Sequence, residues 1–357
     1  MKKVGILTFH RAKNYGAVLQ AYALKETLCK LNCSISVINY VSPLMLYGKK
    51  YVFFSKKIKL FLQFLKNFKS FNTLKTYYNF NDFRYKFFNE TEQKNIKFNK
   101  NFDLFITGSD QVFNPRITGF DKNYFLDFVR DKNKCFSYAA SFGLSYADLT
   151  VEEKSFVKKN LKNFKLISLR EKQGADIVNK LSNIKTDVHI DPSLLLNKQD
   201  WLKISKIPKE DNFIVLYLLE NNENIIKFAY DLAKTKKMDL VYFNPYNKQI
   251  NIKTKIVNPS PQEWLGYMLK AKYVVTNSFH GLCFSINFNK QFFVDFLPQN
   301  FSVNSRLENL LDITNLKDRL IYNIETNYGK SIDWDSINKI IEQEREKSLN
   351  YLQSIVL

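Results

Sequence analysis

The chain has 357 residues, of which 45% are hydrophobic and 15% aromatic, and it carries 54 basic against 34 acidic residues. This composition excludes an intrinsically disordered chain, because 32 Phe and 20 Tyr supply ample apolar surface for a core. Four cysteines are too few for a disulfide framework at this length, which favours reduced thiols in a cytoplasmic protein. No apolar run approaches the ~18 residues of a membrane-spanning helix, so we expect a soluble or peripheral protein.

The first elements along the chain alternate between strands and helices. A strand at KVGILTF, the polar loop HRAKNYG, a helix at AVLQAYALKETLCKL and a strand at SISVINY form a βαβ unit. Further strands are expected at FDLFITGSD, CFSYAAS and KLISLRE, with helices at VEEKSFVKKNLKNF and KQGADIVNKL. HIDPSLLL closes this half, and the polar residues 197–211 predict a linker. The alternation predicts a parallel sheet with helices on both faces, and therefore a Rossmann-like domain over residues 1–196.

Residues 44–100 form a basic and aromatic insert in this domain. No Asp or Glu occurs from Thr27 to Asn81, and such a basic patch attracts phosphate groups. Within it, IKLFLQFLKNFKSF places apolar residues near helical spacing between lysines. That pattern is typical of a helix at an anionic membrane surface, although an amphipathic helix that packs on its own domain has the same pattern. The insert has no recognisable nucleic-acid-binding motif, so we expect no nucleic-acid partner.

The same alternation restarts in the second half of the chain. Strands are expected at NFIVLYLL, DLVYF, YVVTN and QFFVDF, with helices over Ile225 to Thr235 and at PQEWLGYMLKA and LCFSINFN. This predicts a second Rossmann-like domain over residues 212–330, and a long helix in residues 333–357 that crosses back onto the first half. The expected fold class is α/β, with two doubly wound domains that face each other across a cleft.

Ligands of open parallel sheets bind beyond the carboxyl ends of the strands, so the loops there hold the candidate site. His280 is expected at a strand-to-helix turn, where its imidazole can change protonation near neutral pH. Gly281 is expected to permit a tight turn, and the following helix N-terminus to present N–H groups to an anion. A histidine that only caps the turn gives the same pattern.

Two further strand ends carry charged residues. Arg170, beside Glu171, is either half of a surface ion pair or a clamp for a carboxylate or phosphate. Asp110 is either a general base or the N-cap of the next helix. The loop HRAKNYG matches neither GxGxxG nor GxxxxGK[ST], which removes the usual support for a dinucleotide or P-loop site. No metal-binding motif occurs, so no metal is expected.

Six motifs, in this order and spacing, resemble the polysaccharide pyruvyl transferase family: NYGAVLQAYAL, ITGSDQVF, SYAASFG, SLRE, HIDPSLLL and NSFHGLCFSI. The resemblance covers residues 3–319. It implies a fold similar to the two-domain GT-B glycosyltransferases, with the acceptor side in the first domain and the donor side in the second. It also implies transfer of the enolpyruvyl unit of phosphoenolpyruvate to a sugar of a cell-surface polysaccharide, such as a capsule or exopolysaccharide, usually as a cyclic ketal.

The resemblance also implies roles for individual residues. His280 is expected to be the general acid that protonates phosphoenolpyruvate, and Asp110 the base for the attacking hydroxyl. Many members have Arg two positions before the motif His, where this chain has Ser278, so Arg306 or Lys290 is expected to supply that charge. The residues expected to bind the donor are Arg170, Ser278, Gly281, Arg306 and Lys290. The residues expected to bind the acceptor are Asn14, Tyr15, Gly16, Gln111 and Ser141.

Phosphoenolpyruvate is expected to be a co-substrate, with no cofactor. If the basic insert contacts the membrane, a glycan linked to a lipid pyrophosphate at the inner face of the plasma membrane is the natural acceptor. Two other functions fit the same fold or charge: a GT-B glycosyltransferase that uses a nucleotide sugar, and a noncatalytic polyanion-binding protein.

Overall fold

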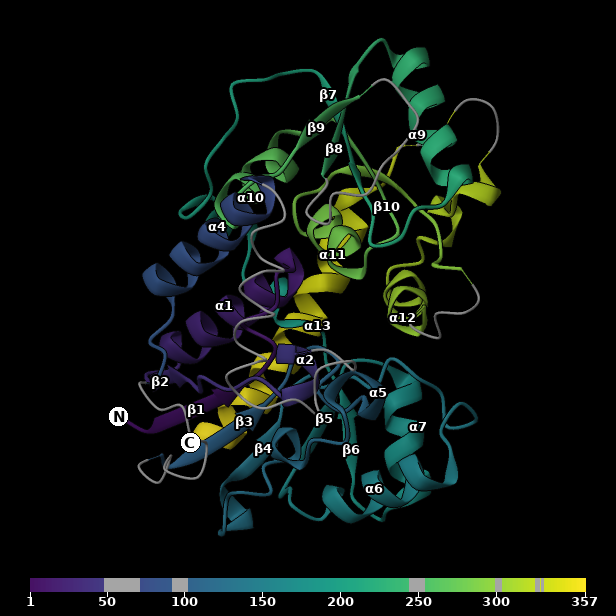
Figure 1. The fold of residues 1–357 in the computed structure, drawn as a ribbon. Coiled ribbons are helices and arrows are strands. Elements are labelled where there is room, and N and C mark those ends of the chain that lie inside the picture. The colour runs from purple at the N-terminus through teal and green to yellow at the C-terminus, as the bar shows by residue number, and fades with distance from the viewer. Residues whose placement is uncertain (48–70, 92–101, 244–253, 299–303, 325–327, 329–330) are drawn as a thin grey trace. The chain divides into compact units, whose positions relative to one another are not determined.

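The computed structural model describes residues 1–47, 71–91, 102–243, 254–298, 304–324, 328 and 331–357 (Figure 1). The chain divides into two compact units. The first unit contains Met1–Lys13, Ala17–Leu195 and Glu346–Leu357, and the second contains Asn14–Gly16 and Leu196–Arg345. The predicted interfacial helix over residues 58–68 lies outside the described residues.

The first unit is built on short parallel strands whose side chains are largely buried. Its four-stranded sheet has the order β2-β1-β3-β4, from β1 (Lys3–Leu7), β2 (Ser34–Val37), β3 (Leu104–Thr107) and β4 (Cys135–Ser137). A parallel pair, β5 (Ile167–Leu169) and β6 (Thr186–Val188), adjoins β4 through isolated parallel bridges. Apolar residues on both sides of these strands are buried, as expected for a parallel sheet with helices on its faces.

The helices of the first unit are α1 (Tyr15–Lys30), α2 (Pro43–Tyr47), α4 (Phe71–Phe87), α5 (Pro115–Thr118), α6 (Val151–Leu161) and α7 (Lys172–Leu181). Helix α6 begins with a capping box, in which Thr150 and Glu153 each satisfy the other's backbone N–H. Aromatic rings fill the core beside it, where Phe113 stacks on Phe125 with ring centroids 4.6 Å apart. The ordered core positions the loops at the strand ends.

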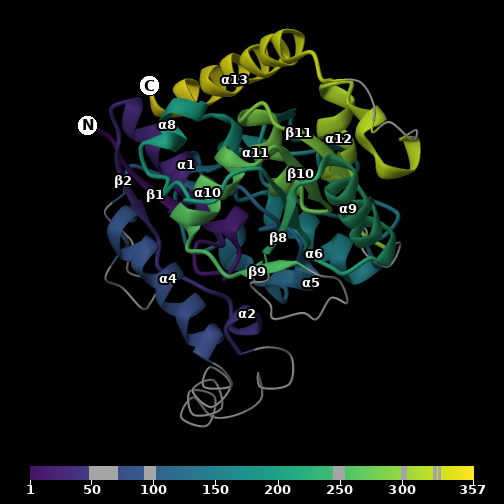
Figure 2. The same ribbon diagram turned by 90° about the horizontal axis from the view of Figure 1, so that it is seen from above.

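The second unit has a five-stranded parallel sheet in the order β11-β10-β7-β8-β9. Its strands are β7 (Phe213–Tyr217), β8 (Asp239–Phe243), β9 (Lys255–Val257), β10 (Tyr273–Thr276) and β11 (Gln291–Val294). Its helices are α8 (Lys198–Leu202), α9 (Glu223–Lys236), α10 (Pro261–Lys270), α11 (Phe279–Asn287) and α12 (Ser305–Ile313). Figure 2 shows α9 on one side of β10 and α10 with α11 on the other, as in a doubly wound sheet.

Helix α13 (Trp334–Val356) contributes to both units. Its residues up to Arg345 belong to the second unit, and its residues from Glu346 belong to the first. In the first unit the Tyr351 hydroxyl donates to the Ser137 carbonyl at 2.8 Å, and Ser348 Oγ accepts from the Ile190 amide at 3.3 Å. The end of this helix is therefore part of the first unit's core.

In each sheet there is one pair of adjacent strands from which the chain continues in opposite directions across the sheet. In the first unit β1 leads to β2 on one side and β3 to β4 on the other, so the reversal lies between β1 and β3. In the second unit the corresponding point lies between β7 and β10. A doubly wound sheet binds ligands in the crevice outside the carboxyl ends of the two strands at such a point. These two places are therefore where functional side chains are expected.

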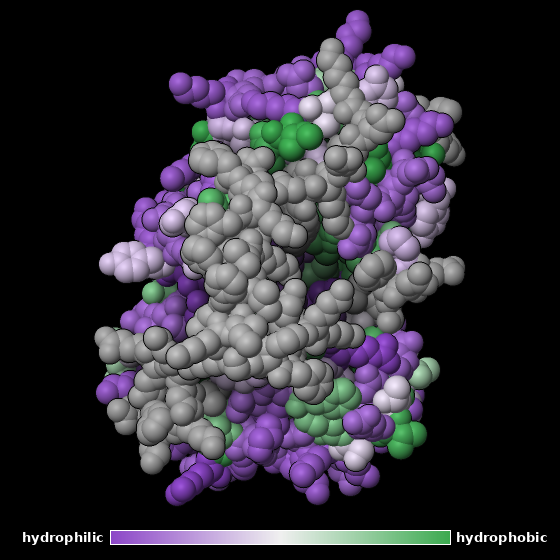
Figure 3. Space-filling model, viewed as in Figure 1, coloured by the Kyte–Doolittle hydropathy of each residue, from purple (hydrophilic) through white to green (hydrophobic). Residues whose placement is uncertain are grey.

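The predicted fold class of two Rossmann-like α/β domains is confirmed. The stretch expected to be a linker is different: residues 198–202 form α8, whose buried Trp201 packs edge-on against Phe284 within the second unit. Among the described residues, no helix is long and apolar enough to span a bilayer. Hydrophilic side chains dominate the described part of the face shown in Figure 3.

Candidate functional site

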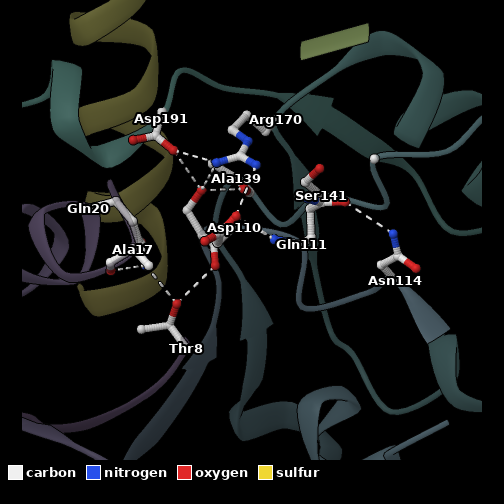
Figure 4. Close-up of polar contacts among 12 residues, drawn as sticks. Thr8, Ala17, Gln20, Asp110, Gln111, Asn114, Ala139, Ser141, Arg170 and Asp191 are labelled. Carbon is white, nitrogen blue, oxygen red and sulfur yellow. Dashed lines mark hydrogen bonds and ion pairs between the residues drawn. The ribbon is translucent and has the colours of Figure 1, made fainter. Parts of the chain in front are cut away.

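The first unit places Asp110 at its winding reversal, in the loop after β3 (Figure 4). Thr8 lies at the end of the neighbouring strand β1, and its hydroxyl donates to the Ser109 carbonyl at 2.9 Å. The Gln20 amide in turn donates to the Thr8 hydroxyl at 2.8 Å. Asp110 has φ of 72°, in the left-handed region that Asp tolerates better than most residues. The loop is thus fixed by buried polar contacts on the β1 side.

A buried ion-pair network surrounds Asp110. The Arg170 guanidinium donates from Nη1 to Asp191 Oδ2 at 2.7 Å, and its Nη2 lies 3.5 Å from Asp110 Oδ1. Ser109 Oγ donates to the same Asp191 oxygen at 3.1 Å. Burial disfavours the charge on Arg170, but the carboxylates of Asp191, Asp110 and Glu171 together outweigh burial and raise its pKa. Arg170 is therefore a permanent cation that orients Asp110.

A second buried carboxylate, that of Glu171, orders the loop beside this network. Glu171 Oε1 accepts from the Ser141 hydroxyl at 2.9 Å and from the Phe142 amide at 3.1 Å. Gly143 follows in the left-handed region, with φ of 60°, and a Cβ there would lie 2.0 Å from Gln111 Oε1. The motif SYAASFG therefore requires glycine at position 143, because the side chain of Gln111 packs against the backbone there.

In the second unit, His280 lies in the first turn of α11, immediately beyond β10 at the winding reversal. Ser278 is the N-cap, and its hydroxyl accepts from the Gly281 amide at 3.3 Å. The side chain of Asn277 joins the ends of β10 and β7, because Oδ1 accepts from the Leu219 amide and Nδ2 donates to the Glu220 carbonyl. His280 is only 6% exposed, so its ring is held within this edge of the sheet.

Arg306 is a cation that contacts Phe279, the residue before His280 in the chain. The Arg306 guanidinium carbon lies 5.6 Å from the centroid of the Phe279 ring, and the Phe279 and His280 ring centroids are 5.2 Å apart. A guanidinium over an aromatic face gains about 0.5–2 kcal/mol and remains charged. The Phe279 ring therefore links Arg306 to the first turn of α11.

Lys290 lies at the amino ends of the strands of the second unit's sheet, whereas His280 lies beyond their carboxyl ends. It precedes β11 and is next to Lys272, which precedes β10, because Tyr273 pairs with Gln291 at the start of both strands. Burial, together with the nearby charges of Lys198 and Lys272, lowers the pKa of Lys290 to about 8. His280 lies beyond the other ends of these strands, so the expected donor-binding role of Lys290 is wrong for a site at His280.

A sequence model of one protein family matches residues 14–294, and its description is polysaccharide pyruvyl transferase. This match spans most of both units. The chain belongs to the polysaccharide pyruvyl transferase family. It is accordingly a transferase, and the family resemblance inferred from its motifs is confirmed.

Comparison with other known proteins adds the following. No curated protein sequence matches this family member. It is similar in structure to a UDP-GlcNAc 2-epimerase from Neisseria meningitidis bound to UDP-GlcNAc, with 14% identity, a TM-score of 0.45, and 97% of this chain and 100% of the other covered. It is also similar to the glycotransferase of kitacinnamycin, with 9% identity, a TM-score of 0.49, and 100% and 99% coverage. These TM-scores are below 0.5 and carry no weight for function.

The structure sorts the predicted site residues of this pyruvyl transferase between the two units. The first unit brings together Asp110, Gln111, Ser141 and Arg170. The second unit holds the remaining residues of the prediction: Asn14, Tyr15, Gly16, Ser278, His280, Gly281, Lys290 and Arg306.

The structure corrects the expectation of a turn at Gly281 and excludes one of the two alternatives left open for each of Asp110 and Arg170. Gly281 makes no left-handed turn; it lies within α11, where a Cβ would meet Thr276 Oγ1 at 2.4 Å, so its role is close packing of helix on strand. Asp110 is not a helix cap, because Asn114 caps α5. Arg170 forms no surface pair, since its side chain is 1% exposed and pairs with Asp191.

Sequence reasoning missed Asp295, which directly follows β11 at the same edge as His280. Asp295 Oδ2 accepts from Asn222 Nδ2 at 2.8 Å, and Oδ1 accepts from the Phe296 amide at 2.8 Å. Burial raises its pKa, partly offset by the Phe296 amide. The signal was present in the sequence, because QFFVDF is a buried strand with a carboxylate at its end.

Proposed function

We propose that this transferase moves the enolpyruvyl unit of phosphoenolpyruvate onto a sugar of a cell-surface polysaccharide precursor and forms a pyruvate ketal. The observation that carries the proposal is the position of His280. The residue lies beyond the carboxyl end of β10, at the winding reversal of the second sheet and within the residues that the family model matches, and its neighbour Phe279 contacts the Arg306 guanidinium. A proton donor next to a cation is what phosphoenolpyruvate requires, since its methylene carbon must be protonated while its carboxylate and phosphate are held.

The first half of the reaction is an addition to the double bond. The His280 imidazolium gives its proton to the methylene carbon, which makes the neighbouring carbon electrophilic. A sugar hydroxyl oxygen forms a bond to that carbon, and its proton passes to Asp110 as general base. The product of this step is a tetrahedral carbon that carries the methyl group, the carboxylate, the sugar oxygen and the phosphate.

The second half replaces phosphate by a second hydroxyl. The bond from carbon to the phosphate oxygen breaks, its electron pair leaves with phosphate, and phosphate takes the proton held by Asp110. A second hydroxyl of the same sugar then attacks the resulting cation and returns its proton to His280. The two hydroxyl protons thus end on the methyl group and on phosphate, with no change of oxidation state, and both residues regain their starting forms.

We propose Arg306 as the principal ligand for the anionic groups of the donor in the second unit, in place of the family Arg that is Ser278 here. Ser278 and Gly281 would support it through the α11 N-terminus, where the Ser278 hydroxyl accepts from the Gly281 amide. We propose Arg170 as a further donor ligand from the first unit. Because Arg170 also pairs with Asp191, part of its effect would act through the orientation of Asp110.

For the acceptor, we propose a lipid-pyrophosphate-linked glycan at the cytoplasmic face of the membrane, contacted by Asn14, Gln111 and Ser141. The support for the lipid linkage is the sequence of the basic insert, whose lysines alternate with aromatic residues. An anionic membrane surface would attract this segment and bring the enzyme to its substrate.

The test is to incubate the purified protein with phosphoenolpyruvate and a panel of lipid-linked glycans, and to measure product masses. Ketal formation gives a gain of one pyruvic acid less one water, with release of inorganic phosphate. His280→Gln should remain folded and lower turnover by about 10²-fold or more, the usual scale for a lost general acid. If a nucleoside diphosphate protects the protein from heat unfolding and phosphoenolpyruvate does not, a nucleotide-sugar transferase replaces this proposal.

A further inference from the structure

The first residues of α1 are packed into the second unit by the side chain of Tyr15. Its ring is fully buried and stacks on Trp264 with centroids 5.6 Å apart, and it meets Tyr217 edge-on at 6.0 Å. The Tyr15 hydroxyl donates to the Pro259 carbonyl at 2.8 Å. Aromatic pairs of this kind add about 0.5–1.5 kcal/mol each to the burial of a ring. Tyr15 is therefore a core residue of the second unit, and the acceptor contact expected of it is wrong.

This packing places the backbone of Gly16 against the imidazole of His280. A Cβ built on Gly16 would lie 2.0 Å from His280 Nδ1, 2.2 Å from Cγ and 2.7 Å from the His280 Cβ. Real Cβ atoms do not approach other heavy atoms so closely, so even one methyl group would displace the ring or the helix turn. Gly16 has an ordinary helical backbone in α1, so what matters here is the missing side chain and not unusual backbone freedom.

We propose that Gly16 is the positioning residue for the general acid. Its bare backbone receives the Nδ1 edge of the imidazole, while Phe279 lies beside the ring. With Nδ1 and Cγ covered by Gly16, the nitrogen at the far end of the ring, Nε2, is the one that meets the methylene carbon of phosphoenolpyruvate. The space above Gly16 is filled by His280, so the expected contact of Gly16 with the acceptor is replaced by this role. The catalytic part of the inference rests on the proposed pyruvyl transfer; the packing part does not.

Gly16→Ala is the direct test. The added methyl group should rotate the imidazole and lower kcat by about 10-fold to 10²-fold, because a displacement of about 1 Å at a reacting group costs that much. The KM for phosphoenolpyruvate should change little, since the donor's anionic groups are held elsewhere. In a double-mutant cycle, adding Gly16→Ala to His280→Gln should cause no further loss, because the two residues would act through one group.

Histidine ring NMR supplies a readout that does not depend on activity. The chain has three histidines, and His10 and His189 lie in the first unit, where they serve as internal standards. Gly16→Ala should shift the ring nitrogen signals of His280 and leave those of the other two in place. Gly174→Ala is the matched control for the NMR readout, because Gly174 is also helical and lies in the first unit, where the nearest atoms to its Cβ would be a Leu169 methyl at 3.1 Å and Glu171 Oε1 at 3.3 Å. It should leave the His280 signals in place.

A second variant covers the case in which Gly16→Ala does not fold. Tyr15→Phe keeps both ring contacts and removes only the bond to Pro259, so it should fold, shift the His280 signals slightly and reduce kcat about two- to threefold. Unchanged His280 signals in both variants, or wild-type kcat in a folded Gly16→Ala protein, would overturn the inference. If the wild type transfers no pyruvyl group yet Gly16→Ala shifts His280 alone, the proposed function fails and the packing role stands.

Discussion

Mild acid should destabilise the first unit through its two buried histidines. His189 lies between Tyr138 and Tyr351, with ring centroids at 6.1 and 4.5 Å, and its Nδ1 contacts Ser168 Oγ at 2.8 Å. Burial, and to a smaller extent the charge of Lys347, lowers the pKa of His189 from 6.5 to about 4. The folded unit thus keeps this imidazole neutral at pH values where the unfolded chain protonates it.

His10 behaves in the same way. Burial, with smaller contributions from the charges of Arg84 and Arg11, lowers its pKa from 6.5 to about 3. Glu90 Oε1 lies 3.6 Å from His10 Nε2 and would favour the charged ring, but the same oxygen accepts from Arg84 Nε at 2.9 Å. Because Arg84 already balances this carboxylate, burial decides the protonation state of His10.

The magnitude follows from proton linkage. For a group with a pKa of 6.5 unfolded and about 4 or 3 folded, the stability present above pH 6.5 is lost as the pH falls below that value. At pH 5 each histidine costs about 2 kcal/mol, so the pair costs about 4 kcal/mol. The Glu153 carboxylate does not contribute to the change between pH 7.5 and pH 5. Arg116 lowers its pKa from 4.5, so its contribution to the free energy of unfolding is lost only at more acid pH.

The assay is urea unfolding at pH 7.5 and pH 5, followed by far-UV circular dichroism and by tryptophan fluorescence. Trp201, Trp264 and Trp334 all belong to the second unit, so fluorescence reports that unit, while circular dichroism reports both. With a slope near 2 kcal/mol per molar urea, the transition of the first unit should move down by about 2 M. His189→Gln should remove about half of this shift. An unchanged midpoint in the wild type, or a full shift in the variant, would refute the reasoning.

Three further outcomes are expected. Arg170→Lys keeps the charge but loses the planar fork, so it should mainly raise the KM for phosphoenolpyruvate; an unchanged KM in steady-state assays would make Arg170 purely structural. If Asp110 is the base, Asp110→Asn should lower kcat by about 10²-fold or more, and Asp295→Asn should lower it by less. A larger loss of kcat in Asp295→Asn, measured across a pH–rate profile, would transfer the role to Asp295. Replacing five lysines by Gln should reduce the free energy of binding to anionic liposomes by up to several kcal/mol, at ~1 kcal/mol per residue, as measured by co-sedimentation. Turnover on a short soluble acceptor should not change. No liposome binding by the wild type at low salt would refute the membrane argument. The five are Lys56, Lys57, Lys59, Lys66 and Lys69.

The fold could be predicted from the sequence because its information is local. Buried parallel strands read as short apolar runs, and the runs over β1, β3, β7 and β10 were recognised on that basis. The rule that ligands bind beyond strand ends also located His280 and Asp110 at the two winding reversals. Elements without a clear apolar run, such as β9 with its two exposed residues, gave no such signal.

The parts of the site that could not be predicted depend on contacts between distant residues. Nothing in the local sequence states that Arg170 meets Asp191, or that Gly16 meets the ring of His280. Lys290 follows the motif histidine closely in sequence, yet α11 carries the chain from one edge of the sheet to the other between them. The donor-binding role expected of Lys290 required it to lie near His280, and the length of the intervening helix separates the two residues.

The assignment of the end of α13 to the first unit has a consequence for biosynthesis. A ribosome delivers the chain from its N-terminus, so β1 to β6 emerge long before Ser348, Tyr351 and Leu352 are available to pack beside them. The first unit can therefore complete its core only after residues 346–357 of α13 have emerged, whereas residues 196–345 contain a complete sheet and can fold earlier. The order in which the two units mature should thus be the reverse of the order in which they are translated, with the nascent first unit exposing part of its core until residues 346–357 become available.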